Sequence, residues 1–131
     1  MDSEAESLFV STFIRKEKRN RLKELLPHPK RRAKVLSTLD HFRDLDERFA
    51  TLIPDSEQST DLIYSRLIKL GAPAECHLIS SNQNWDGIKL PLFEALNTII
   101  GMGMGTLVIC QPTQLGYYEG ESANDRWILK K

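Results

Sequence analysis

The chain has 131 residues, of which 40% are hydrophobic and 27% are charged. This length suits one domain that buries most of its surface, and the composition excludes wholesale disorder. Lysine and arginine together number 18, as do aspartate and glutamate, so the net charge of zero excludes a uniformly basic or acidic protein. We therefore expect one domain over residues 1–131, with a helical part at 1–56 and an α/β part at 57–131.

The N-terminus and the cysteines indicate where the protein works. The first ten residues, MDSEAESLFV, carry three acids and no basic residue, which is the wrong polarity for a secretory signal. No apolar run approaches the roughly 20 residues of a membrane span. Cys76 and Cys110 both lie in apolar segments, as buried thiols do. We expect a cytoplasmic protein without membrane contact and with two free thiols, and a disulfide between them is the alternative.

The first half of the chain shows helical spacing of apolar residues. A first helix is predicted from Ser3 to Leu26, opened by a capping box of Ser3 and Glu6 and ended by the PHP sequence at 27–29. A second helix begins at Pro29 and carries one apolar stripe as far as Leu45. A third covers 60–70, and Gly71 ends it.

The second half alternates strands and helices. Strands are predicted at 75–81 and 106–111, with a helix at 91–100 between them, and extended segments follow at 117–121 and 126–131. A strand–helix–strand unit crosses over right-handed and makes its two strands parallel. The predicted class is α/β, leaning towards α+β: N-terminal helices packed on a small mixed sheet that contains one βαβ unit and a C-terminal antiparallel meander.

The sequence GMGMGT at 101–106 resembles a phosphate-binding glycine loop in composition only. Such loops leave a strand and open a helix, whose free N–H groups meet the phosphates. Here the predicted helix comes before Gly101 and the predicted strand after Gly105, and no Gly-Lys-Ser/Thr ending is present. The glycines are therefore interpreted as a joint between a helix and a buried strand.

A polar loop follows the first predicted strand, and a glutamine follows the second. Ligands collect beyond the carboxyl ends of parallel strands, so we expect a site for an anionic or amide-bearing partner there. The alternative is a solvated loop in which Trp85 folds back over the core. The residues of this predicted site are Ser80, Ser81, Asn82, Asn84, Trp85, Asp86 and Gln111.

Catalytic and metal-binding patterns are scarce, and we predict no catalytic residue, metal site or cofactor. His77 and Cys110 are candidates for a base and a nucleophile, but parallel pairing would separate them by several residues. A cysteine and a histidine inside apolar strands are more typical of a core. His28, His41 and His77 have no metal-ligand spacing.

Residues 15–34 contain ten basic side chains and only two acids, Glu17 and Glu24. This density suits salt-sensitive binding to a nucleic-acid backbone. The favoured interpretation is pairing with the acids at 40–61, within one chain or across a homodimer. The basic residues are Arg15, Lys16, Lys18, Arg19, Arg21, Lys23, Lys30, Arg31, Arg32 and Lys34.

Two adjacent tyrosines precede a glutamate in the LGYYEGE segment. Neighbouring strand residues point to opposite faces, so one of Tyr117 and Tyr118 should be buried and the other should face outwards beside Glu119. An exposed tyrosine of this kind would suit a protein interface. The alternative is a partly buried sheet residue with a solvated neighbour.

The run SSNQNWDGIKLPLFEALNTIIGMGMGTLVICQPTQLGYYEGE, with the FIRKEKR and PKRRAKVL segments at the front, resembles a set of small bacterial proteins of unassigned activity. The resemblance implies a free-standing bacterial cytosolic protein and assigns no functional residue. The lack of catalytic spacings and the charge-segregated helices favour a non-enzymatic regulatory protein that acts on a protein partner. Nucleic-acid backbone binding by 15–34 is the first alternative, and a small enzyme or ligand binder using the 80–86 loop is the second.

Overall fold

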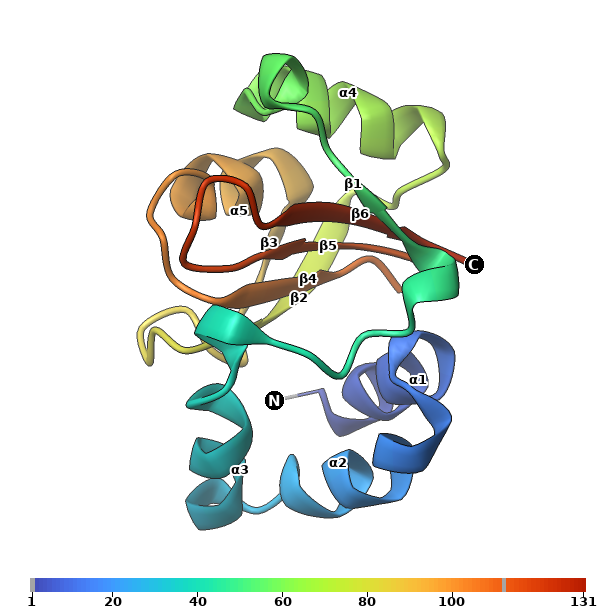
Figure 1. Cartoon of the computed structure of the whole chain (residues 1–131), viewed down its shortest axis with the longest axis vertical. Coiled ribbons are helices and arrows are strands. Elements are labelled where there is room, and N and C mark those ends of the chain that lie inside the picture. The colour runs from blue at the N-terminus through green and yellow to red at the C-terminus, as the bar shows by residue number, and fades with distance from the viewer. Residues whose placement is uncertain (1, 112) are drawn as a thin grey trace.

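A computed structural model describes residues 2–111 and 113–131 of the chain. Its centre is a six-stranded sheet in the order β1-β6-β5-β4-β2-β3, in which every neighbouring pair is antiparallel (Figure 1). The strands are β1 (Ala50–Leu52), β2 (Glu75–Ser80), β3 (Lys89–Pro91), β4 (Thr106–Ile109), β5 (Leu115–Glu119) and β6 (Arg126–Lys130).

Helices cover both faces of the sheet (Figure 1). One layer consists of α1 (Ser3–Phe13), α2 (Arg19–Leu25) and α3 (Pro29–Leu36), and the other of α4 (Thr60–Lys69) and α5 (Leu92–Ile99). Single 3₁₀ turns are η1 (Lys16–Lys18), η2 (Leu39–His41), η3 (Glu47–Phe49) and η4 (Asp55–Glu57). The mixed α/β class predicted from the sequence is confirmed, and so is the antiparallel meander of β4, β5 and β6.

Alternate strand residues supply two separate cores. Ile79, Leu107 and Tyr118 face α1–α3, whereas Leu78 and Val108 face α4 and α5. Because both faces are covered, the central strands are apolar almost without interruption and lack the polar alternation of a half-exposed sheet. None of the helices in the described part of the chain has the length and apolar character needed to cross a membrane.

The predicted parallel βαβ unit is wrong. β2 pairs with β4 antiparallel, with His77 opposite Ile109 and Ser80 opposite Thr106. The cause is β3, a strand that the sequence analysis missed. The chain turns back after β2 and pairs as β3, so α5 crosses over from β3 and β4 enters on the other side of β2. The sheet is therefore antiparallel throughout and not mixed.

The first two predicted helices are also shorter than expected. α1 ends at Phe13, where Ile14 forms an isolated bridge with Leu45 and the Arg15 N–H donates to the Asp44 carbonyl at 2.9 Å. α3 ends at Leu36, and the following segment is held by Tyr118, whose hydroxyl accepts the Phe42 N–H at 3.1 Å. Tertiary hydrogen bonds here replace the helical ones that periodicity alone predicts.

The glycine joint is confirmed. α5 ends at Ile99, Gly101 and Gly103 have φ values of 85° and 68°, and β4 begins at Thr106. Gly105 lies so close to the Leu39 backbone at η2 that an added Cβ would clash with it, so a side chain would not fit there.

Candidate functional site

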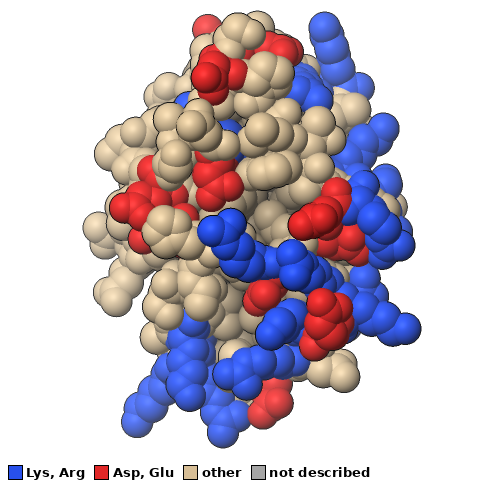
Figure 2. All heavy atoms as spheres, in the orientation of Figure 1, with Lys and Arg blue, Asp and Glu red and all other residues tan. Residues whose placement is uncertain are grey.

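The basic stretch forms one surface over η1, α2 and α3, which we call the basic surface. Leu22 and Leu25 of α2 and Val35 of α3 point into the core, and this turns most of the lysines and arginines between them to solvent. Basic side chains gather over this end of the molecule in Figure 2. The exposed members are Lys16, Lys18, Arg21, Lys23, Lys30, Arg31 and Lys34, whereas Arg15 and Arg19 are half-buried.

The expected pairing of this surface with the acids at 40–61 is limited to one contact among the described residues. Arg15 lies 3.7 Å from Glu47, and the two side chains are 41% and 89% exposed. Arg31 pairs within the stretch, with Glu24 at 3.1 Å. Two of the acids have other partners: Asp46 pairs with Arg48 at 2.6 Å, and Asp40 accepts from Ser81 and Gly105. Hydrogen bonds from Arg48 lower the pKa of Asp46 to about 2.

A hollow opens between α2 and α3 within the basic surface. Its volume is about 110 Å³, and three cationic side chains from different turns converge on it, Lys18, Arg21 and Lys34. Leu22, Leu25 and Val35 form its floor, Thr38 adds a hydroxyl, and Asp44 is its one acid. We call this feature the basic hollow. The Thr38 hydroxyl donates to the Val35 carbonyl at 2.7 Å, so the three cations alone make the arrangement suitable for a phosphate group.

Arg32, the tenth basic residue, belongs to a buried network and not to the basic surface. It is 3% exposed, and its guanidinium donates to Glu6 at 2.6 and 2.7 Å and to Asp86 at 2.7 and 2.8 Å. A further bond at 3.2 Å reaches the Leu26 carbonyl, so all five guanidinium N–H groups have acceptors. His77 completes the network through its Nε2 atom, 2.8 Å from Glu6. Arg32, Glu6, His77 and Asp86 are called the Arg32 network below.

The charges in the Arg32 network stabilise one another. Burial alone raises the pKa of Glu6, but hydrogen bonds from His77 and Arg32 outweigh it and hold that pKa below its ordinary value. Burial likewise lowers the pKa of Arg32, and its bonds to Asp86 and Glu6 reverse this and raise it. The sequence analysis assigned Glu6 to a capping box, whereas Asp2 is the residue that caps α1, by accepting from the Ala5 N–H at 3.0 Å.

The 80–86 loop follows β2, as the sequence predicts, but most of its polar groups form hydrogen bonds within the protein. The Asp86 carboxylate accepts from Arg32 and from the Ser80 N–H at 3.0 Å. The Ser80 hydroxyl lies 2.8 Å from that of Thr106. Ser81 donates to Asp40, Asn82 accepts from the Asn84 N–H, and Trp85 packs against the core of α4 and α5. The alternative of Trp85 folded back over the core matches this arrangement.

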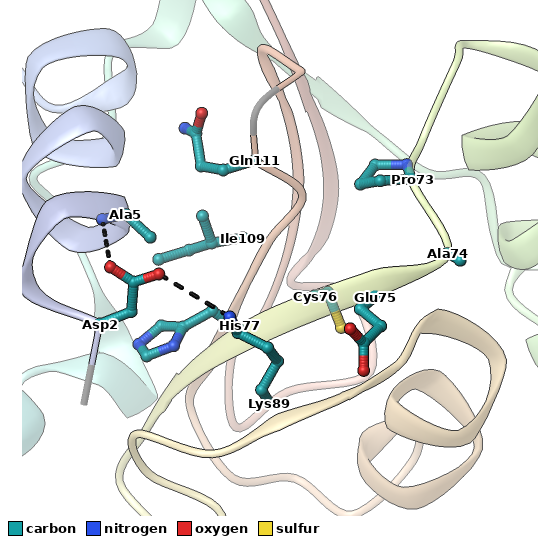
Figure 3. A pocket seen from close by; sticks show the side chains of 10 residues that line it. All are labelled: Asp2, Ala5, Pro73, Ala74, Glu75, Cys76, His77, Lys89, Ile109 and Gln111. Atoms are coloured by element: carbon teal, nitrogen blue, oxygen red, sulfur yellow. Dashed lines mark hydrogen bonds and ion pairs between the residues drawn. The ribbon is translucent and has the colours of Figure 1, made fainter.

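Gln111 does not join this loop. Because β4 is antiparallel to β2, the end of β4 lies beside the start of β2, where Gln111 lines a pocket of about 360 Å³ with Asp2, His77 and Lys89 (Figure 3). We call this the β2 pocket. The sequence analysis missed Asp2 and Lys89 here, and its only signal for His77 was a histidine within an apolar strand.

Tyr117, Tyr118 and Glu119 are each no more than 1% exposed, so the predicted outward tyrosine is wrong. Both faces of β5 are covered by helices, and no tyrosine can face solvent. Tyr117 donates to Glu119 at 2.8 Å, and Glu119 accepts the Gly101 N–H at 3.0 Å, which fixes the glycine joint. Burial raises the pKa of Glu119, even though Tyr117 and Arg126 act in the opposite direction.

The cysteines offer no activated nucleophile. Both are free and buried, and burial raises the pKa of each thiol to about 12. Cys76 and Cys110 face α4 and α5, whereas His77 faces α1 on the opposite side of the sheet. Within the described residues, no group of three or more His, Cys, Asp or Glu side chains is placed to hold a metal ion.

No protein-family model, curated protein or solved structure matches the chain.

Proposed function

We propose that the protein binds the phosphate backbone of nucleic acid through the basic surface. The observation that carries this proposal is the basic hollow, where Lys18, Arg21 and Lys34 converge around a space of about 110 Å³. A phosphate seated there would contact cations from η1, α2 and α3 together. Neighbouring phosphates would meet the other exposed cations of the same surface, such as Lys16 and Lys30.

The composition of the surface supports a polyanion over a protein as partner. Five of the seven exposed basic residues are lysines, a residue type that is depleted in protein interfaces. None of the exposed large hydrophobic side chains lies within 15–34. A protein-binding surface would ordinarily present aromatic or aliphatic anchors. The burial of Tyr117 and Tyr118 also removes the exposed tyrosine that would have suited a protein interface.

The same surface supports backbone recognition without base readout. The basic surface has no aromatic side chain on which bases could stack. Phosphate contacts fix position and carry no sequence information by themselves. We therefore infer that affinity depends on salt and on the number of phosphates, and little on base sequence.

The test is fluorescence anisotropy of a labelled RNA and of a labelled duplex DNA with the full chain, at about 50 and about 200 mM salt. We expect affinity to fall steeply with salt in both cases. The triple substitution Lys18→Gln, Arg21→Gln and Lys34→Gln should reduce the slope of log K against log salt by up to roughly 2.7 for duplex DNA, because each phosphate that the protein neutralises adds roughly 0.9 to that slope.

The matched control removes three exposed lysines elsewhere, Lys69, Lys130 and Lys131, and should leave the slope nearly unchanged. Absence of binding at the lower salt concentration overturns the proposal. An equal effect of the two triple variants overturns it as well, because attraction would then follow net charge alone. Tighter binding to poly-L-glutamate than to RNA would instead identify an acidic protein as the partner.

A further inference from the structure

The β2 pocket is separate from the basic surface and has features of a small-ligand site. It lies between the start of α1, the start of β2 and the end of β4 (Figure 3). Its volume of about 360 Å³ falls at the lower end of the roughly 300–1,000 Å³ range of ligand pockets. A ligand of few heavy atoms is therefore the right size.

Gln111 lines this pocket, and its side-chain amide has a donor without an acceptor in the described part of the chain. Its Nε2 atom is buried and has no hydrogen-bond partner among the described residues. Burying an N–H group without an acceptor is costly, and nearly all such groups in folded proteins are satisfied. Because no acceptor among those residues holds it, the Gln111 amide is free to turn towards an oxygen atom of a ligand in the pocket.

Two side chains of opposite charge line the same pocket. Lys89 of β3 and Asp2 before α1 approach each other only to 3.9 Å, and their side chains remain 57% and 40% exposed. Lys89 can therefore turn to a ligand at little cost, since exposed ion pairs contribute little. Asp2 keeps one oxygen on the Ala5 N–H as the cap of α1 and can accept from a ligand with the other. Gln111 and Lys89 together offer donors to a carboxylate, and Asp2 offers a carboxylate to an ammonium group.

The remaining walls are His77, apolar side chains, the Cys76 thiol and the exposed carboxylate of Glu75, which is a second acid able to accept from an ammonium group. Ile109 and Pro73 line the pocket without a polar side-chain atom. The His77 ring is oriented by Glu6 through Nε2, and its Nδ1 atom makes no hydrogen bond within the part of the chain that the structure describes. When Nε2 carries the proton that Glu6 accepts, Nδ1 is an acceptor for a second ligand N–H.

We infer that the β2 pocket binds a free α-amino acid with an aliphatic side chain. The carboxylate would accept from Gln111 and Lys89, the ammonium group would donate to Asp2 and His77, and the side chain would pack against Ile109 and Pro73. A carboxylate alone would draw Lys89 away from Asp2, and an amine alone would leave Gln111 unsatisfied, so a ligand with both ionic groups fits the pocket better than either group alone.

The experiment is an NMR titration of the ¹⁵N-labelled full chain with L-leucine, with 4-methylpentanoate and with isoamylamine. The second probe lacks the ammonium group and the third lacks the carboxylate. We expect L-leucine to shift amide signals at 2–5, 73–77 and 109–111, and each fragment to bind at least about tenfold more weakly, because each loses a charge-assisted hydrogen bond.

Gln111→Leu removes the donor at similar volume and should weaken L-leucine binding at least about tenfold. It should not lower the thermal stability of the free protein, because the deleted N–H has no partner there. Gln114→Leu, a change at an exposed glutamine nearby, is the control and should leave binding unchanged. Shifts scattered outside the pocket, or equal affinity in both variants, overturn the inference. Nucleic-acid binding is unaffected by either result, so this test and that of the proposed function fail independently.

Discussion

The two helical layers cover opposite faces of one sheet by different physical means. α4 and α5 attach through apolar side chains, with Ile63, Leu67 and Leu96 no more than 1% exposed. α1 to α3 have a comparable apolar core, to which the Arg32 network is added. Apolar contacts are non-directional, whereas bidentate ion pairs accept only a narrow range of geometries.

This difference shows where charge lies in a protein whose net charge is zero. The layer that carries the basic surface on its outside also carries the buried Arg32 network on its inside. Arg32 of α3 joins Glu6 of α1 and Asp86 of the loop after β2, so three separate segments are held in one arrangement. We infer that this network fixes α3 on the sheet, and with it the position of Lys34 relative to Lys18 and Arg21.

Breaking the Arg32 network should have the largest effect on stability. Arg32→Met leaves Glu6 and Asp86 buried without their cation, and removal of one partner from such a network costs about 3–5 kcal/mol of unfolding free energy. Urea unfolding at neutral pH measures this loss. Adding Glu6→Gln to the variant should recover part of the stability, because one unpaired buried charge is then removed. A double variant less stable than Arg32→Met would contradict this explanation.

Truncating a buried side chain in the apolar layer of α4 and α5 should cost somewhat less stability than breaking the Arg32 network. Leu67 is 0% exposed in the core of α4 and α5, and Leu67→Ala is expected to cost roughly 2–5 kcal/mol. Because no charge is involved, the loss should be the same at low and high salt and at neutral and mildly acidic pH. A loss that changes strongly with pH would show that the two layers are not as different as their contacts indicate.

Helices that depend on local signals could be predicted from the sequence. α4 covers Thr60–Lys69, close to the predicted 60–70, and Gly71 follows it with a φ of 101° as expected. The Ser59 side chain caps its start by accepting the Leu62 N–H at 3.2 Å. The glycine joint after α5 was predictable for the same reason. In each case the signal and the structure it specifies lie within a few residues.

Features that depend on distant segments could not be predicted. β1 and β3 have three residues each, too few for a periodic pattern, and the direction of β4 relative to β2 follows from β3. Glu6 has the right spacing for a cap, and its burial depends on Arg32, 26 residues away. The β2 pocket could not be predicted either, because it depends on the direction of β4. Antiparallel pairing of β4 with β2 places Gln111 at the opposite end of the sheet from the 80–86 loop.

Lowering the pH should destabilise the layer of α1–α3 before the layer of α4 and α5. The pKa of Glu6 is lowered in the folded protein from an ordinary value of 4.5, so its contribution to stability is complete above that value and is lost as pH falls through the folded pKa. Glu119 acts in the opposite direction, because burial raises its pKa and protonation relieves a buried charge. We expect stability to fall below about pH 4.5 in the wild type and in Leu67→Ala.

Two variants separate these contributions. Glu6→Gln should be less stable at neutral pH and should lose much less stability on acidification, since the titrating group is gone. Glu119→Gln should show a steeper acid loss, because the compensating protonation is removed. Urea unfolding midpoints compared between about pH 6 and about pH 3 provide the measurement. Parallel pH profiles for the wild type and Glu6→Gln would rule out the Arg32 network as the acid-sensitive element.

The smallest loss of stability is expected at Arg31, which is next in the chain to Arg32, the site of the largest expected loss. Arg31 adjoins Arg32 on α3, but its side chain is 55% exposed and its partner Glu24 is 66% exposed. Exposed ion pairs of this kind contribute roughly 0–1 kcal/mol, so Arg31→Met should shift the urea midpoint little and less still at high salt. The contrast with Arg32→Met isolates burial, because the two substitutions are chemically identical and adjacent. A large destabilisation by Arg31→Met would mean that the outer face of α3 is covered in solution, as it would be in the homodimer considered from the sequence, and gel filtration of the wild type would then show a dimer.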